Sequence, residues 1–290
     1  MTEDWNLFER NKNNEHSVIF MNLALKLEAP LAGYTKLITF VFNMYSLWDK
    51  AGSTSKSAQQ LFYSLEDKLM ERMKDTQAVY VGRISVDNKM ELYFYGQPSV
   101  EWDSQLKSIS ADFPDFRYYY HINNDEEWTF YHTDMLPTPM EEQWMRNAKI
   151  AYALKQHGDD SETVRDVEHW LHFPSKSSMD EVKNKVELLG YRITNADLDS
   201  TKTTNPYVLQ VSKQHALELN TVNEVTRELF VLASEVNGTY DGWGTRLKLK
   251  FPTRVRFAFI KIKKKISSPW VIAAIISILI AVVLLMWWLY

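Results

Sequence analysis

The sequence predicts an α+β fold with two ferredoxin-like-type α/β sandwich domains in tandem, followed by a single C-terminal transmembrane helix. Helix caps and strand-forming runs alternate on both sides of a short proline-bearing segment at 134–139, which predicts two domains. Residues 266–290 hold no charged side chain, which predicts the span. The expected parts are domains at 1–137 and 138–246, a basic juxtamembrane stem at 247–265 and a transmembrane helix at 266–290.

The first domain is expected to be a layer in which helices cover one face of a mainly antiparallel sheet. Ser57 and Gln60 form a capping box before apolar residues that recur every four positions, which predicts a helix. A tight polar turn at 87–89 predicts a hairpin. The expected order is β-β-α-β-β-α-β, with strands at 17–27, 34–44, 78–86, 90–95 and 116–122 and helices near 57–73 and 100–110.

The second domain has clearer helix boundaries. A capping box from Thr138 to Glu141 begins a helix that ends before Gly158. After this leading helix the expected order is β-α-β-β-α-β, which is the ferredoxin-like order. Its strands are expected at 164–173, 191–195, 207–215 and from 239, and its helices at 178–189 and 221–236.

Charge is unevenly distributed along the chain. Nine of the 33 Lys and Arg lie within 246–265, which holds no acid, so residues 1–245 carry 24 basic and 37 acidic side chains. This body, at −13, is a poor match for direct nucleic-acid binding, which needs cations to neutralise phosphates. The chain has no cysteine, which excludes disulfides, zinc–thiolate sites and thiol nucleophiles.

The C-terminal run predicts a single-pass, tail-anchored protein of the cell membrane. The twenty residues from Trp270 to Leu289 would form a helix of about 30 Å, the thickness of a bilayer core. A buried core helix is the alternative, but only Ser277 interrupts 271–286. Positive charge on the N-terminal flank places the domains in the cytoplasm. That flank is expected either to contact anionic lipid or to serve only as a topology signal. Its cations nearest to the expected span are Lys261, Lys263, Lys264 and Lys265.

Several short motifs in the second domain occur in a fixed order. They are Gly158-Asp159-Asp160, Val167-Glu168-His169-Trp170-Leu171, Leu189-Gly190-Tyr191 and Thr239-Tyr240-Asp241-Gly242-Trp243-Gly244-Thr245. Together they resemble the family of regulator of ribonuclease activity B, the ribonuclease E inhibitor, over roughly 145–246. The resemblance implies a protein that binds an endoribonuclease and restrains RNA cleavage by contact, without catalysis.

The first domain resembles the domain of unknown function 695. The match rests on Tyr80-Val81-Gly82-Arg83, Leu92-Tyr93-Phe94-Tyr95-Gly96 and Glu127-Trp128-Thr129-Phe130-Tyr131. It implies a fold more than a function. The function expected for the whole chain is a membrane-anchored, non-catalytic regulator of a cytoplasmic protein partner. A tethered scaffold unrelated to RNA decay and a hydrolase are the alternatives.

The Asp-Gly-Trp-Gly string is a candidate contact surface, because glycines let a partner backbone approach and Trp243 offers a large amphipathic surface. Alternatively, Trp243 packs in the core and Gly242 permits a bend. Strand alternation places Asp241 and Trp243 on one face and Tyr240 and Gly242 on the other, so only one pair can be buried. The expected partner-binding residues are Tyr240, Asp241, Gly242, Trp243, His169, Trp170 and Asp159.

No metal, cofactor or catalytic group is expected. His169 and His172 are three apart on a strand and face opposite sides, so they do not form a ligand pair. No phosphate loop, nucleophile elbow or dinucleotide fingerprint is present. A hydrolase would require a pocket that gathers at least two of His157, Asp159, His169 and His172.

Overall fold

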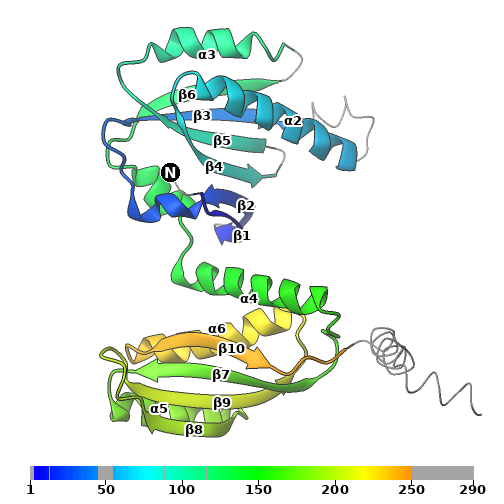
Figure 1. Cartoon of the computed structure of the whole chain (residues 1–290), viewed down its shortest axis with the longest axis vertical. Coiled ribbons are helices and arrows are strands. Elements are labelled where there is room, and N and C mark those ends of the chain that lie inside the picture. The colour runs from blue at the N-terminus through cyan, green and yellow to red at the C-terminus, as the bar shows by residue number, and fades with distance from the viewer. Residues whose placement is uncertain (1–2, 13, 45–54, 88, 115–116, 250–290) are drawn as a thin grey trace, which may run out of the picture. The chain divides into compact units, whose positions relative to one another are not determined.

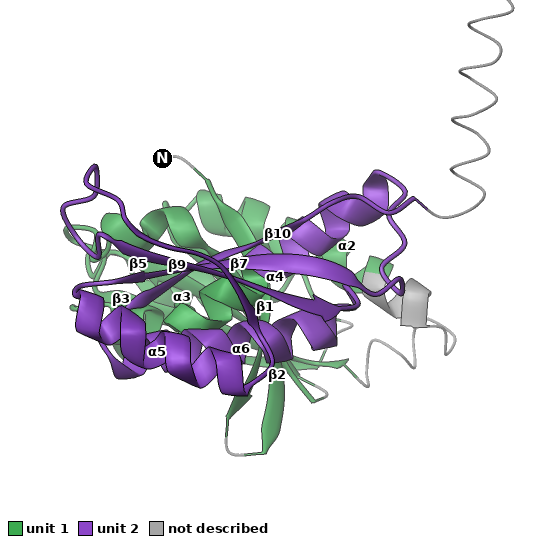
Figure 2. Cartoon of the chain, turned by 90° about the horizontal axis from the view of Figure 1, so that it is seen from below, with its two compact units in different colours: residues 1–145 green, residues 146–290 purple. Residues whose placement is uncertain are grey.

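The computed structural model describes residues 3–12, 14–44, 55–87, 89–114 and 117–249 (Figure 1). The chain forms two compact units, unit 1 at 1–145 and unit 2 at 146–290, which are coloured separately in Figure 2. The boundary between them lies within α4 (Pro139–Gln156). The domain boundary expected after residue 137 stays a prediction.

Unit 1 contains a six-stranded antiparallel sheet in the order β1-β2-β4-β5-β3-β6. Helices α2 and α3 cover one of its faces (Figure 1). Its elements are β1 (Trp5–Lys12), β2 (Glu15–Asn22), η1 (Leu23–Leu27), β3 (Lys36–Asn43), α2 (Ser55–Lys74), β4 (Val79–Val86), β5 (Lys89–Gly96), α3 (Trp102–Ser110), β6 (Tyr118–Asn124) and η2 (Tyr131–Met135).

Strand β1 was not expected, and its presence makes the predicted order and the ferredoxin-like fold wrong for unit 1. Its sequence is largely polar, yet it pairs with β2 over its whole length at the sheet edge. The strand expected at 17–27 ends at Asn22, whose side chain accepts a hydrogen bond from the Ala24 amide (3.2 Å) and caps η1. Edge pairing and local capping therefore decide the beginning of this unit.

Aromatic packing holds both faces of the unit 1 sheet. Phe40 and Phe94 face α2 and α3 in one fully buried cluster. On the other face, Tyr95 stacks on the buried Trp128 ring with centroids 3.8 Å apart, and the Trp128 indole N–H donates to the Tyr34 carbonyl (2.7 Å). The sheet is thus buried from both sides along its central strands.

The start of α4 is tied to β1 by a largely buried ion pair. Arg10 donates through Nε and Nη2 to the two carboxylate oxygens of Glu141, at 2.8 Å each. The same carboxylate accepts from the Thr138 amide (2.7 Å), and the Thr138 hydroxyl accepts from the Glu141 amide, which completes the predicted capping box. Burial would raise the pKa of Glu141, but the hydrogen bonds from Arg10 and Thr138 lower it below its usual value.

Unit 2 has the predicted β-α-β-β-α-β order after α4 and an antiparallel sheet in the order β10-β7-β9-β8. Helices α5 and α6 lie on one face of this sheet (Figures 1 and 2). Its elements are β7 (Arg165–Phe173), α5 (Lys176–Leu188), β8 (Arg192–Leu198), β9 (Tyr207–His215), α6 (Leu219–Glu235) and β10 (Thr239–Thr245).

The membrane part of the predicted fold class requires correction. No helix within the described ranges is long and apolar enough to cross a membrane. The longest of them, α2 and α4, carry charged side chains along their length. The fold class is therefore corrected to two α+β units whose described helices include none that spans a membrane, and the predicted single-pass, tail-anchored location in the cell membrane is not supported. The stem with Lys261, Lys263, Lys264 and Lys265 and the segment 266–290 lie outside the described residues, and the expected lipid contact has no support.

The Arg10–Glu141 pair gives a stability prediction for unit 1. We expect Arg10→Met to lower the free energy of unfolding by about 3 kcal/mol, because it leaves a buried carboxylate without its cation. Native-state hydrogen exchange in β1 and β2 measures this. Lys12→Met is the control, because Lys12 and Asp134 form an exposed pair and its loss should change stability by less than about 0.5 kcal/mol. Equal effects of the two substitutions would contradict the assignment.

Candidate functional site

The sheet of unit 2 has one covered face and one open face. Along β7 the side chains of Val167, His169 and Leu171 are fully buried toward α5 and α6. The alternate residues, Glu168 and Trp170, are half-buried and point the other way. We call the face turned away from α5 and α6 the open face.

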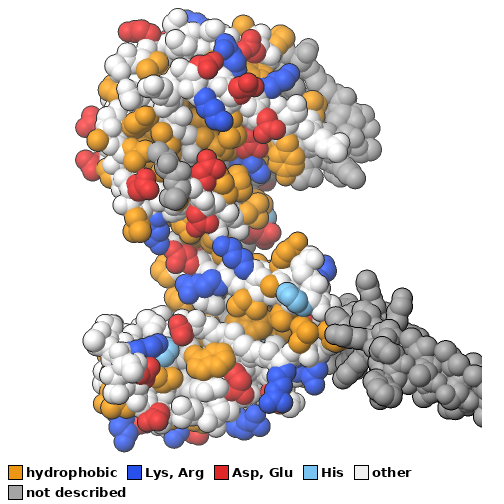
Figure 3. All heavy atoms as spheres, in the orientation of Figure 1, with side chains coloured by type: hydrophobic (Ala, Val, Ile, Leu, Met, Phe, Trp, Pro, Cys, Tyr) orange, Lys and Arg blue, Asp and Glu red, His pale blue; other side chains and the backbone are white. Residues whose placement is uncertain are grey.

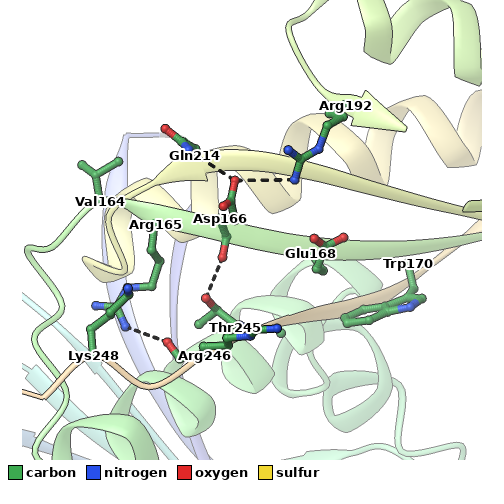
Figure 4. A pocket seen from close by; sticks show the side chains of 11 residues that line it. Val164, Arg165, Asp166, Glu168, Trp170, Arg192, Gln214, Thr245, Arg246 and Lys248 are labelled. Atoms are coloured by element: carbon green, nitrogen blue, oxygen red, sulfur yellow. Dashed lines mark hydrogen bonds and ion pairs between the residues drawn. The ribbon is translucent and has the colours of Figure 1, made fainter. Parts of the chain in front are cut away.

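A hollow of about 730 Å³ lies on the open face (Figure 4). It is lined mainly by outward side chains of β7 and its neighbours and by the chain that follows β10. Charged side chains of both signs are visible among apolar ones on this side of unit 2 in Figure 3. The lining residues are Val164, Arg165, Asp166, Glu168, Trp170, Arg192, Gln214, Gly244, Thr245, Arg246 and Lys248.

Trp170 lies at one end of the hollow, against β10 (Figure 4). A Cβ atom placed on Gly244 would lie 3.2 and 3.3 Å from two carbons of the indole ring. The ring is therefore in close contact with backbone that only glycine leaves uncovered. This packing holds a large aromatic side chain at the edge of the hollow.

The carboxylates of the open face have different partners. Asp166 accepts from Gln214 (3.3 Å) and lies 3.7 Å from the Arg192 guanidinium. Glu168 accepts through Oε2 from Thr194 (3.0 Å) and Gln210 (3.3 Å), and both of these donors are neutral. Asp166 thus has a cation nearby, whereas Glu168 forms no ion pair with any described residue.

A β-bulge reorganises the Tyr-Asp-Gly-Trp-Gly motif. Tyr240 pairs with Leu171 and Gly242 with Trp170, so the intervening Asp241 is the extra residue. Tyr240 and Trp243 both point inward and are 6% exposed, which makes the expected alternation wrong at this point. Asp241 turns outward and lies 3.4 Å from His172, while Gly242 has φ of +146°, a conformation that side chains disfavour.

The buried Trp243 is held by a polar network from two helices. Its indole N–H donates to the side-chain oxygen of Asn147 on α4 (2.9 Å). The Asn147 amide donates in turn to Thr226 (2.8 Å) and Asn223 (2.9 Å) on α6. Trp243 is therefore a core residue that joins β10 to α4 and α6.

His169 belongs to a second buried chain of hydrogen bonds. His215 Nδ1 lies 2.7 Å from the Ala216 carbonyl, which can only accept, so that nitrogen carries a proton and His215 Nε2 accepts. His169 Nε2 is 3.5 Å from it and donates, which leaves His169 Nδ1 to accept from the Tyr240 hydroxyl (2.9 Å). Burial lowers the pKa of both imidazoles, and with His215 and Lys213 nearby the pKa of His169 falls to about 3, which favours the neutral form of both rings assumed in this assignment.

Asp159 is also an interior residue. Its carboxylate pairs with Arg165 at 2.7 Å, and both side chains are 2% exposed. The same oxygen accepts from the Lys248 amide (2.7 Å), so the pair attaches the chain after β10 to the start of β7. Asp159 therefore acts from the interior, because it holds Arg165, which lines the hollow.

The predicted partner-binding residues thus divide into two groups. Trp170, Asp241 and Gly242 lie on the open face, while Tyr240, Trp243, His169 and Asp159 are buried. None of His157, Asp159, His169 and His172 lines the hollow, so the condition set for a hydrolase is not met there. Within the described ranges, no group of three His, Asp or Glu could hold a metal ion.

Sequence reasoning missed Arg192, Gln214, Arg246 and Lys248 as lining residues of the hollow. They come from three separate stretches of chain that only the sheet brings together. Outward alternation along β7 was the one available signal, and it identifies Asp166, Glu168 and Trp170 as a row.

Two family models match the chain. The model of a family of unknown function, DUF695, matches residues 3–136, and the model for regulator of ribonuclease activity B matches residues 144–245. Both agree with the families that the sequence resembles.

Several curated proteins named regulator of ribonuclease activity B are similar to this chain. The protein from Xenorhabdus nematophila is 31% identical over 114 residues, which covers 38% of this chain and 78% of that protein. Those from Pantoea ananatis and Escherichia coli K12 are 26% and 24% identical, over 37% and 38% of this chain and 76% and 80% of their own lengths. A solved structure of an unknown protein from Galdieria sulphuraria covers 72% of this chain and 96% of its own, at 9% identity and a TM-score of 0.21, which is too low to support an argument.

His169 gives a prediction for the pH dependence of stability. The unfolded chain takes up a proton on this imidazole near pH 6.5, whereas the folded chain does so only near pH 3. Stability from this residue is therefore fully present above pH 6.5 and is lost as the pH falls toward 3, by at most about 5 kcal/mol.

Urea unfolding of the full chain at several pH values between about 4 and 7 measures this effect. We expect His169→Gln to flatten the pH dependence, because the amide keeps an acceptor for Tyr240 without titrating. His16→Gln is the control, since His16 is exposed. If the unfolding free energy of the His169 variant changed with pH as steeply as that of the wild type, His169 would not be the source of the pH dependence.

The Trp243 network gives a second stability prediction. We expect Asn147→Ala to lower the free energy of unfolding of unit 2 by about 3 kcal/mol, because it leaves the Trp243 indole N–H buried without an acceptor and removes the hydrogen bonds from Asn147 to α6. Hydrogen exchange of the indole N–H should also become faster. Asn195→Ala, at an exposed position of β8, is the matched control and should have little effect. If hydrogen exchange at the Trp243 indole N–H were as slow in the Asn147 variant as in the wild type, the result would argue against the network.

Proposed function

This chain belongs to the regulator of ribonuclease activity B family, and from that premise we propose that it regulates the activity of a ribonuclease by protein contact. The contact surface is the open face of the unit 2 sheet. The single observation that carries this assignment is Trp170, a half-buried aromatic held on an uncovered sheet face beside a hollow.

The composition of the open face supports a protein contact. Interfaces are enriched in Trp, Tyr and Arg, and a few such residues in desolvated surroundings supply most of the binding energy. Trp170 and Arg192 line the same hollow, with polar side chains around them. A rigid sheet also needs little rearrangement to present them.

Regulation rather than catalysis is the activity that we propose. The relatives are named as regulators, and the histidines and Asp159 that a hydrolase would use are distributed between the interior and separate surface positions. The hollow offers no paired nucleophile and base among its described lining residues. Binding is the function for which its residues are suited.

The signature motif has two roles in this proposal. Trp170, Asp241 and Gly242 belong to the contact surface. Tyr240 and Trp243 are positioning residues, because they fix β10 from inside and so set where Gly244 supports Trp170. His169 and Asp159 likewise act from the interior.

The test is an RNA-cleavage assay with the full chain. The nuclease to use is ribonuclease E, the enzyme that the family resemblance indicates. We expect the wild-type chain to slow cleavage and Trp170→Ala to weaken that inhibition by about thirtyfold, the effect of removing a central interface aromatic. Tyr152→Ala, which removes an exposed aromatic on α4, is the control and should inhibit like wild type.

The outcomes separate the alternatives. If the Trp170 variant inhibited cleavage as strongly as the wild type, the contact surface would have to lie elsewhere on the protein. Absence of both binding and inhibition by the wild-type chain would overturn the ribonuclease role and favour the scaffold alternative, in which the partner is unrelated to RNA decay.

A further inference from the structure

We infer that Glu168 and Trp170 together receive an arginine side chain from a basic segment of the partner protein. The inference rests on the proposed function for the open face being a contact surface. It goes further by naming the chemistry of the segment that binds there.

The two side chains are neighbours on one strand. Glu168 and Trp170 occupy successive outward positions of β7, which lie about 7 Å apart along a strand. A guanidinium that stacks on the indole can therefore reach the carboxylate with the same planar group. Arginine has that length and shape, since it combines stacking on aromatic faces with bidentate hydrogen bonding to carboxylates.

The Trp170 ring has no cation of its own. No Lys or Arg among the described residues lies over it, although Arg83 lies 4.4 Å from the Phe20 ring centre and Lys213 lies 4.3 Å from that of Tyr191. The described part of the chain thus pairs cations with other rings and places none over this one. Its face is available to a cation from outside.

Glu168 likewise forms no ion pair among the residues that the structure describes. Three buried carboxylates of this chain, those of Glu66, Glu141 and Asp159, each pair with an arginine at 2.6 to 2.8 Å. The half-buried Glu168 has only the neutral donors Thr194 and Gln210, both on Oε2. Its Oε1 accepts no hydrogen bond within the described part of the chain. A guanidinium would supply both the missing donor and the missing charge.

The cations of the hollow do not fill this position. Arg192 faces Asp166, and Lys248 lies at the end opposite to Trp170 (Figure 4). Arg246 lines the same hollow but forms no ion pair with Glu168. Glu168 and Trp170 thus lie in the hollow without a paired cation among the described residues.

Charge at long range favours the same class of partner. Residues 1–245 carry a net charge of −13, which steers basic segments toward this body. A ribonuclease must present Lys and Arg to neutralise RNA phosphates. A partner arginine held by Glu168 and Trp170 would be withdrawn from RNA, which gives the contact a direct way to lower cleavage.

The experiment uses the full chain and fluorescein-labelled peptides of repeated Gly-Ser-Arg units, followed by fluorescence anisotropy. Matched peptides carry lysine or the neutral isostere citrulline in place of arginine. We expect the arginine peptide to bind more tightly than the lysine peptide and the citrulline peptide to bind least.

The variants test each part of the site. Glu168→Gln and Trp170→Ala should each weaken arginine-peptide binding by about tenfold, because each removes one of the two interactions. Glu168→Gln keeps an acceptor for Thr194 and Gln210, so the fold is retained. Lys176→Ala, at an exposed position on α5, is the matched control and should leave binding undiminished.

Three results would overturn the inference. The first is equal binding of the arginine and citrulline peptides, and the second is unchanged or tighter binding of the arginine peptide by Glu168→Gln. The third is binding of a labelled RNA oligonucleotide that is lost in Arg246→Ala, because that result would make the hollow an anion-binding site. Ribonuclease inhibition measured with the same variants separates the two proposals. Inhibition that persists in Glu168→Gln sinks only the arginine site, whereas arginine-selective binding without inhibition sinks only the ribonuclease role.

Discussion

The extra residue at Asp241 is the constraint on which the arrangement of unit 2 depends. Without this bulge, Tyr240 and Trp243 would point to opposite faces of β10, and only one of them could be buried. With it, both lie inside, where Tyr240 hydrogen-bonds His169 and Trp243 hydrogen-bonds Asn147. These inward hydrogen bonds fix the position of β10 beside β7. They therefore place Gly244 in contact with the Trp170 ring.

The interior of unit 2 contains two hydrogen-bonded polar networks, one through His169 and one through Asn147. The hydrogen-bond chain from Tyr240 through His169 to His215 is satisfied with both imidazoles neutral, and burial disfavours the charged form of each. The Asn147 network is neutral throughout and joins a strand to two helices. Polar groups in this core specify which strand position meets which helix, a role that apolar contacts alone perform less selectively.

The open face shows why net charge is a poor guide to a local site. The body is strongly acidic, yet the hollow contains Arg192, Arg246 and Lys248 beside Asp166 and Glu168. What distinguishes the face is the pairing of these charges. Asp166 is paired with Arg192, whereas Glu168 forms no ion pair with a described residue, and that difference makes Glu168 the carboxylate available to a partner in our proposal.

The sequence by itself determined the element order of unit 2, because capping boxes, stop glycines and apolar periodicity are local signals. It also carried the family, through motifs in a fixed order. It missed β1, whose polar residues become a strand only by pairing with β2 at an edge. Tertiary structure alone decided that Tyr240 and Trp243 are both buried, because strand alternation cannot reveal a bulge. It also decided which face stays open and which distant side chains meet there, because these depend on pairing between strands far apart in the chain.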